Sequence, residues 1–177
     1  VLVLSLLILV SLTILGISAV SSSLVQNKMS TSMQQSGMAF DAAEAGLAGV
    51  FFESEDEVLL ANNALTDPLS EARQGNQFVP GVDTLSCFEE NTWTNRRITS
   101  GGLSTGTRHT GEGTYQSSPA TNSWSRTAFV REQSCRGSSN VIGGSNINCH
   151  VFIVRGCGQV AGKSRIVANT VSASVYA

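Results

Sequence analysis

The chain has 177 residues, the length of one ordinary domain, with 14% charged residues and a formal net charge of −2. A net charge so near zero argues against a protein that binds nucleic acid through bulk electrostatics. The two histidines and the lack of any Cys-x-x-Cys pair remove most metal-site interpretations, so we expect no metal and no other cofactor.

The chain begins with a strongly apolar segment. Fifteen of the first twenty residues are aliphatic, and no charged side chain occurs before Lys28. About 20 apolar residues form a helix long enough to cross a bilayer. A signal peptide would carry a basic region ahead of its apolar core. Because this chain starts with neither a basic residue nor Met, we expect an N-terminus made by processing or by trimming.

We interpret residues 1–27 as a segment that serves first as a membrane anchor and later as a packing helix in a polymer. Its spaced Ser, Thr and Gly residues favour close helix–helix packing. The alternative is a plain transmembrane anchor on an exported domain. In the polymer interpretation, seven aliphatic residues pack in the filament core: Leu2, Leu4, Leu7, Ile8, Leu12, Ile14 and Leu15.

The helical pattern continues beyond the apolar segment, since no proline occurs before Pro68. We predict one helix from about residue 1 to the low 50s, with an extension to Ala64 left open, and take 28–64 as its amphipathic part. Low helix propensity marks Gly16 and residues 21–23 as the places for local unwinding. An apolar stripe at three- and four-residue steps marks the amphipathic face: Met29, Met33, Phe40, Ala43, Leu47, Val50 and Phe51.

Residues 38–47 read MAFDAAEAGL and resemble the AFxAAEAGL motif of PilX-type subunits of type IV pili. The resemblance covers about residues 1–52 and 150–177, and its motif residues here are Phe40, Ala43, Glu44 and Leu47. It implies an α+β, type IV pilin-like fold and a short basic leader that prepilin peptidase removes. It also implies an inner-membrane precursor that the pilus assembly machinery builds into an extracellular filament, used in cell adhesion, with its own copies or other pilins.

One position departs from the usual pilin pattern. Most pilins carry a glutamate at the fifth mature position, thought to pair with the terminal amine of a neighbour. Ser5 stands there if Val1 is the mature N-terminus, and no acid precedes Asp41. The lack of this acid resembles PilX-like and tip-forming subunits; major and minor roles both stay open.

The sequence of residues 65–177 predicts a β-rich globular domain, which we call the head domain. The dipeptide Asp67-Pro68 ends any helix, because the residue before proline avoids the helical region. We predict a long helix with an antiparallel sheet whose apolar face covers the amphipathic half, an α+β architecture. The regions 89–123 and 136–147 are expected to be loops on the filament surface. The predicted strands are 82–88, 124–135, 148–155 and 164–176.

Four cysteines in a chain with an export-type segment predict two disulfides. A Cys149–Cys157 bridge is disfavoured, because eight residues of strand span about 26 Å and bridged α-carbons lie within about 7 Å. Cys135 ends one predicted strand and Cys149 begins the next, so a hairpin would bring them together. We favour Cys135–Cys149 with Cys87–Cys157. A zinc site is the alternative, although the spacings fit no common pattern.

No residues form a recognisable catalytic constellation, so we expect no enzyme. His109 and His150 lack a nucleophile and an acid at suitable spacing, and we expect His150 to pack in a strand. The acidic residues at 53–57 would oppose the dipole of a helix that ended there. Either the helix continues past Glu57, or the run pairs with arginines, on this chain or on a neighbour.

The function predicted is that of a structural filament subunit. The alternatives are a pseudopilin of a type II secretion-like assembly and a membrane-anchored periplasmic protein. A nucleic-acid partner is disfavoured, although a basic surface with stacking aromatics would provide one. The residues of that surface would be Arg96, Arg97, Arg108, Arg126 and Arg131, with Trp93, Tyr115 and Trp124.

Overall fold

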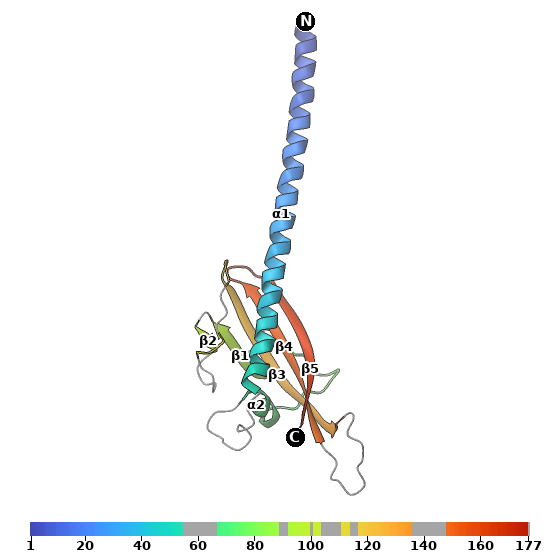
Figure 1. The fold of residues 1–177 in the computed structure, drawn as a ribbon. Coiled ribbons are helices and arrows are strands. Elements are labelled where there is room, and N and C mark those ends of the chain that lie inside the picture. The colour runs from blue at the N-terminus through green and yellow to red at the C-terminus, as the bar shows by residue number, and fades with distance from the viewer. Residues whose placement is uncertain are drawn as a thin grey trace. The chain divides into compact units, whose positions relative to one another are not determined.

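The structure is a computed structural model that describes residues 1–54, 67–88, 92–99, 101–103, 111–113, 117–135 and 148–176. It contains two compact units, Val1–Gly37 and Met38–Ala177. Helix α1 (Leu2–Ser54) makes up the first unit and enters the second. The second unit also contains the short helix α2 (Pro68–Gln74) and one sheet (Figure 1). The predicted α+β class is confirmed.

The sheet has five strands in the order β2-β1-β3-β4-β5, and every neighbouring pair is antiparallel. Three predicted strands are confirmed as its long members and form consecutive hairpins. The strands are β1 (Thr94–Thr99), β2 (Gly102–Leu103), β3 (Thr121–Ser134), β4 (Asn148–Val160) and β5 (Ile166–Tyr176).

Strand β4 continues five residues beyond its predicted end at Arg155. Glycine is usually unfavourable inside a strand, yet Gly156 and Gly158 lie within β4, where it meets α1. A Cβ atom on Gly158 would overlap the carbonyl oxygen of Ala39 and come within 2.6 Å of the backbone nitrogen of Ala43. The glycines therefore mark a close approach between backbones rather than the end of a strand.

The strand predicted at 82–88 is wrong. A turn occupies its start: the amides of Val82 and Asp83 both donate to the carbonyl oxygen of Val79, and Gly81 has a φ of 87°. The carboxylate of Asp83 accepts from the Val79 amide at 2.7 Å, which closes the turn from the other side. Residues 84–88 form no strand, and they lie across the sheet face that α1 does not cover.

Helix α2 and the short strands β1 and β2 were not predicted, and both strands lie in the region 89–123, where a loop was expected. Helix α2 begins where Asp67-Pro68 was taken only as a stop, and the Asp67 carboxylate caps it by accepting from the amides of Leu69 and Ser70. Strand β1 lies between 89 and 123, so that region is not wholly a surface loop. The predicted loop 136–147 lies outside the described residues.

Both faces of the sheet are covered within the second unit. On one face, residues 38–54 of α1 pack on β4, and helix α2 packs on β3 and β1 (Figure 1). This cluster consists of Leu47, Val50, Leu69, Ala72, Phe152 and Val154. On the other face, the segment that starts at Gln77 forms a second cluster, which consists of Phe78, Leu85, Trp93 and Ala128.

The two disulfides join the pairs that the sequence favoured. Cys87 is bonded to Cys157 with α-carbons 6.0 Å apart, and Cys135 to Cys149 with α-carbons 5.0 Å apart. Cys135 and Cys149 flank the β3–β4 hairpin, as expected. The sequence separations are 70 and 14 residues, for which loop closure is worth about 4 and 3 kcal/mol.

Candidate functional site

The apolar segment of α1 presents its side chains outward. The seven residues expected in a filament core are all exposed, from 52% for Ile8 to 77% for Leu2. By length and composition this helix can cross a membrane, with a mean hydropathy of 2.6 over its most apolar stretch. An exposed apolar surface of this size marks a membrane or protein contact.

The few hydroxyl groups in the apolar segment make hydrogen bonds within the helix. Ser5 Oγ donates to the Leu2 carbonyl at 2.8 Å, and Ser11 Oγ to the Ile8 carbonyl at 2.9 Å. Thr13, Ser18 and Ser21 donate in the same way to carbonyls three or four residues earlier. Residues 1–21 can therefore enter lipid or a dry helix bundle with their hydroxyl donors satisfied.

Local unwinding was expected at Gly16 and at 21–23, but α1 is continuous through both places. The back-bonded serine hydroxyl of Ser21 is compatible with helical geometry. A Cβ atom on Gly16 would meet nothing within 4 Å, so no contact inside the described chain requires glycine there. The structure therefore gives no physical reason for a break in the isolated chain.

The second half of α1 has a face made of small residues. Ala39, Ala42, Ala43, Gly46 and Leu47 are buried there. A Cβ atom on Gly46 would come within 2.7 Å of the Trp124 carbonyl oxygen on β3. The Ala-Ala and Gly positions of the motif are therefore small because the helix backbone lies directly against the sheet.

The predicted amphipathic stripe is correct only in part. Ala43, Leu47 and Val50 are buried as expected, whereas the side chain of Phe40 is 45% exposed and Met29 and Met33 are also exposed. The buried face includes Ala39, Ala42 and Gly46, which carry too little apolar surface to appear in a hydrophobic pattern. Phe40 therefore is free to contact another molecule.

Glu44, the acidic residue of the motif, lies on the exposed part of the helix. Its carboxylate accepts a hydrogen bond from the Asn169 side-chain amide on β5. This contact joins the motif to the last strand of the sheet.

The acidic end of α1 is neutralised within the chain. The Glu53 side chain is buried and accepts from Nε of Arg96 on β1 at 3.0 Å. A second nitrogen of Arg96 donates to Glu71 on α2 at 2.7 Å. One guanidinium thus links α1, β1 and α2 and offsets the dipole conflict at the helix end. The other acids of the predicted run lie outside the described residues.

We expect Arg96→Met to lower the free energy of unfolding by about 3–5 kcal/mol, because it leaves the buried carboxylate of Glu53 without this counter-charge. Urea unfolding of the full chain in a non-ionic detergent measures it. Both tryptophans, Trp93 and Trp124, lie in the second unit, so fluorescence reports on that unit.

Arg73→Met is the matched control. Arg73 pairs with Glu132 at 3.3 Å, with both side chains nearly half exposed, and such pairs are worth about 1 kcal/mol or less. Equal losses in the two variants would contradict a structural role for the buried pair.

The other candidate residues belong to the second unit. His150 is buried, as expected, with Nε2 2.7 Å from a Glu132 oxygen and its ring edge-on to Phe129. The basic surface, which the sequence offered only as a disfavoured alternative, does not include Arg96, which faces α1, or Arg126, which is 3% exposed. Trp93 is also buried. His109, Arg108 and Tyr115 lie outside the described residues.

Comparison with known proteins bears on the N-terminal helix. The family model described as PilX N-terminal matches residues 1–48, which include the apolar segment and the small-residue motif. No curated protein and no solved structure matches the chain. The long helix with a C-terminal antiparallel sheet is an arrangement like that of type IV pilins. The first 48 residues thus form a PilX-type N-terminal helix, as the sequence motif indicated.

Proposed function

We propose that this protein is a structural, non-enzymatic subunit of a type IV pilus-like filament and polymerises through residues 1–27. The observation that carries the proposal is the outward-facing apolar surface of that segment, uninterrupted by any charged side chain. Before assembly the inner membrane covers this surface. After assembly other apolar helices, from copies of the chain or from other pilins, cover it.

The energetic argument is that of apolar burial. Each aliphatic side chain moved from water to an apolar contact contributes about 1.5–3 kcal/mol. Exposing seven such side chains to water would be strongly unfavourable in free energy. The segment must therefore pack against other apolar helices as it leaves the membrane. The PilX-type match supports pilus-related packing in particular, because a plain anchor needs no partner helix.

The small-residue face of 38–54 supports the same function. It holds the sheet against α1 through contacts such as the hydrogen bond from Ser123 Oγ to the Ala42 carbonyl, at 2.6 Å. The sheet of the head domain is therefore in direct contact with the same helix whose first part would polymerise. The outward Phe40 side chain is the apolar contact that a neighbouring subunit would cover.

The test is to shear surface filaments from the cells that make this protein and to measure their content by electron microscopy and quantitative mass spectrometry. Abundant recovery of the chain supports a main subunit, and trace recovery supports a minor or tip subunit. Recovery from the membrane fraction alone, with filaments present but free of the chain, would contradict the proposal and favour a membrane-anchored protein or a short pseudopilin assembly.

A further inference from the structure

A pocket of about 550 Å³ lies on the sheet face that α1 does not cover. Ser123 of β3 bonds to α1, so its neighbour Trp124 faces the opposite side. Trp124 pairs in register with Arg97 of β1 and with Cys157 of β4, and all three strands contribute to this face. Every described residue of the pocket wall belongs to the second unit.

The pocket is cationic. Arg97 and Arg126 line it, and the described residues of its wall include no carboxylate. Arg97 is exposed, so its guanidinium can reach a ligand. Guanidinium groups bind carboxylates through two parallel hydrogen bonds, which makes an anion the preferred ligand.

Three side-chain amides share the same wall: Asn95, Asn122 and Gln159. Each amide offers both a donor and an acceptor. That combination fits neighbouring hydroxyl groups, which also donate and accept. Gln159 Nε2 already donates to the Lys163 carbonyl at 2.7 Å, which fixes its orientation and leaves its oxygen as an acceptor.

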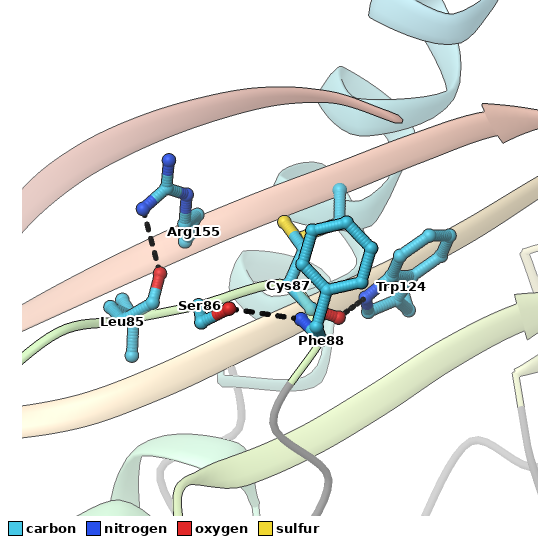
Figure 2. Close-up of a disulfide and its surroundings, with 7 residues drawn as sticks. Leu85, Ser86, Cys87, Phe88, Trp124 and Arg155 are labelled. Carbon is cyan, nitrogen blue, oxygen red and sulfur yellow. Dashed lines mark hydrogen bonds between the residues drawn. A yellow bond between two sulfur atoms is a disulfide. The ribbon is translucent and has the colours of Figure 1, made fainter. Parts of the chain in front are cut away.

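Two aromatic residues also line the pocket, and hydrogen bonds hold the ring of one and the backbone of the other. Nε1 of Trp124 donates to the Cys87 carbonyl at 3.2 Å, and the Phe88 amide donates to Ser86 Oγ at 3.1 Å. Figure 2 shows Phe88 and Trp124 next to Cys87, whose disulfide to Cys157 ties the segment to β4. The Phe88 side chain is 74% exposed. An accessible aromatic ring of this kind suits the apolar face of a pyranose.

The Arg155 guanidinium fixes the same segment from the other end by donating to the Leu85 carbonyl at 2.7 Å (Figure 2). The disulfide and this hydrogen bond flank Ser86. The wall is thus organised before any ligand arrives, which lowers the entropic cost of binding.

We propose that this pocket binds a carboxylated sugar of an acidic glycan. Arg97 pairs with the carboxylate, the amides bind the ring hydroxyls, and Phe88 packs on the sugar face. The volume falls in the range of small-molecule sites. A nucleic-acid duplex is disfavoured, because phosphate recognition needs cations spread along a surface and the chain has a net charge of −2. This inference goes beyond the proposed filament function and does not depend on assembly.

The experiment uses the full, unassembled chain in polyoxyethylene micelles, because detergents with sugar headgroups would compete for the site. Calorimetric titration with 3′-sialyllactose and with digalacturonate is expected to show saturable binding of at least one of them. The methyl ester of the bound sugar should bind at least about tenfold more weakly, since it lacks the charge-assisted hydrogen bonds.

Arg97→Gln is expected to weaken binding of the acidic sugar about tenfold, and Phe88→Ala several-fold. Arg131→Gln is the matched control, because Arg131 is another exposed arginine of the sheet and does not line this pocket. The affinity of this variant for the acidic sugar should equal that of the unmodified protein. The tryptophan emission spectrum verifies that each variant is folded.

Three results would overturn the proposal: no binding of either acidic sugar, equal binding of the acid and its ester, or unchanged affinity in Arg97→Gln. Tighter, Arg97-dependent binding of a single-stranded oligonucleotide would also overturn it in favour of a nucleic-acid site. None of these outcomes alters the filament proposal, because polymerisation is absent from the assay.

Discussion

Replacing Gly158 by alanine is expected to lower the free energy of unfolding of the second unit by about 3 kcal/mol or more. The new Cβ atom would overlap the Ala39 carbonyl oxygen and lie 2.6 Å from the Ala43 nitrogen, and both are backbone atoms of α1. No rotamer change relieves such a clash, so the helix must move away from the sheet. That movement would also weaken the hydrogen bond between Ser123 and Ala42.

The measurement is urea unfolding of the full chain in detergent, followed by tryptophan fluorescence. Gly75→Ala is the matched control, because its φ of −81° suits any residue and its added Cβ would meet atoms no nearer than 3.5 Å. We expect that control to change the free energy of unfolding by less than about 0.5 kcal/mol. A similarly small change in Gly158→Ala would show that α1 does not lie this close to β4.

The sequence predicted the parts of the fold whose signals are local. The charge-free aliphatic run made the first half of α1 evident, and β-branched alternation marked β3, β4 and β5. The cysteine pairing followed from the hairpin geometry of two of those strands. In each case the residues whose pattern predicts the helix or strand are the residues that form it. The prediction therefore needs no information about contacts with distant parts of the chain.

Strand β1 and the end of β4 could not be predicted, because their side chains are explained only by distant partners. Arg96 occupies an inward position of β1 where a hydrophobic residue would normally stand, and it fits because Glu53 of α1 meets it. Gly156 and Gly158 are unfavourable residues for a strand and are explained only by the backbone of α1, which lies against them. A single sequence holds no trace of either contact.

Only the N-terminal part of the candidate site could be predicted, for a similar reason. The seven aliphatic residues were found because they lie in a charge-free apolar run that is long enough to cross a bilayer. The face of α1 that meets the sheet was misassigned at Phe40, since alanine and glycine bury little area and give no hydrophobic pattern. The pocket was missed because its residues come from five separate segments that only the sheet and a disulfide bring together.

Replacing Leu7 by aspartate, or Ile8 by lysine, is expected to abolish filament assembly. Both side chains are more than half exposed in the isolated chain and would be covered by neighbours in the filament. The substitution removes about 1.5–3 kcal/mol of apolar burial and adds a charge that costs about 2.5–3.5 kcal/mol at the centre of a membrane helix. Because every subunit repeats the defect, the loss accumulates along the filament. Counting filaments by electron microscopy, with immunoblots of the membrane fraction to verify insertion, measures the effect.

Ser5→Ala is the matched control and is expected to leave filaments intact. The Ser5 hydroxyl bonds to the Leu2 carbonyl of its own helix, so its removal leaves no partner on a neighbour unsatisfied. A buried carboxylate at this position would need neutralisation to be favourable, so Ser5→Glu should be tolerated only where a neighbour's terminal amine lies within reach. Seven apolar side chains contribute roughly 10–20 kcal/mol per chain, far more than one such ion pair. Loss of filaments in Ser5→Ala, with normal membrane levels, would instead make the hydroxyl an essential contact and contradict cohesion by apolar burial.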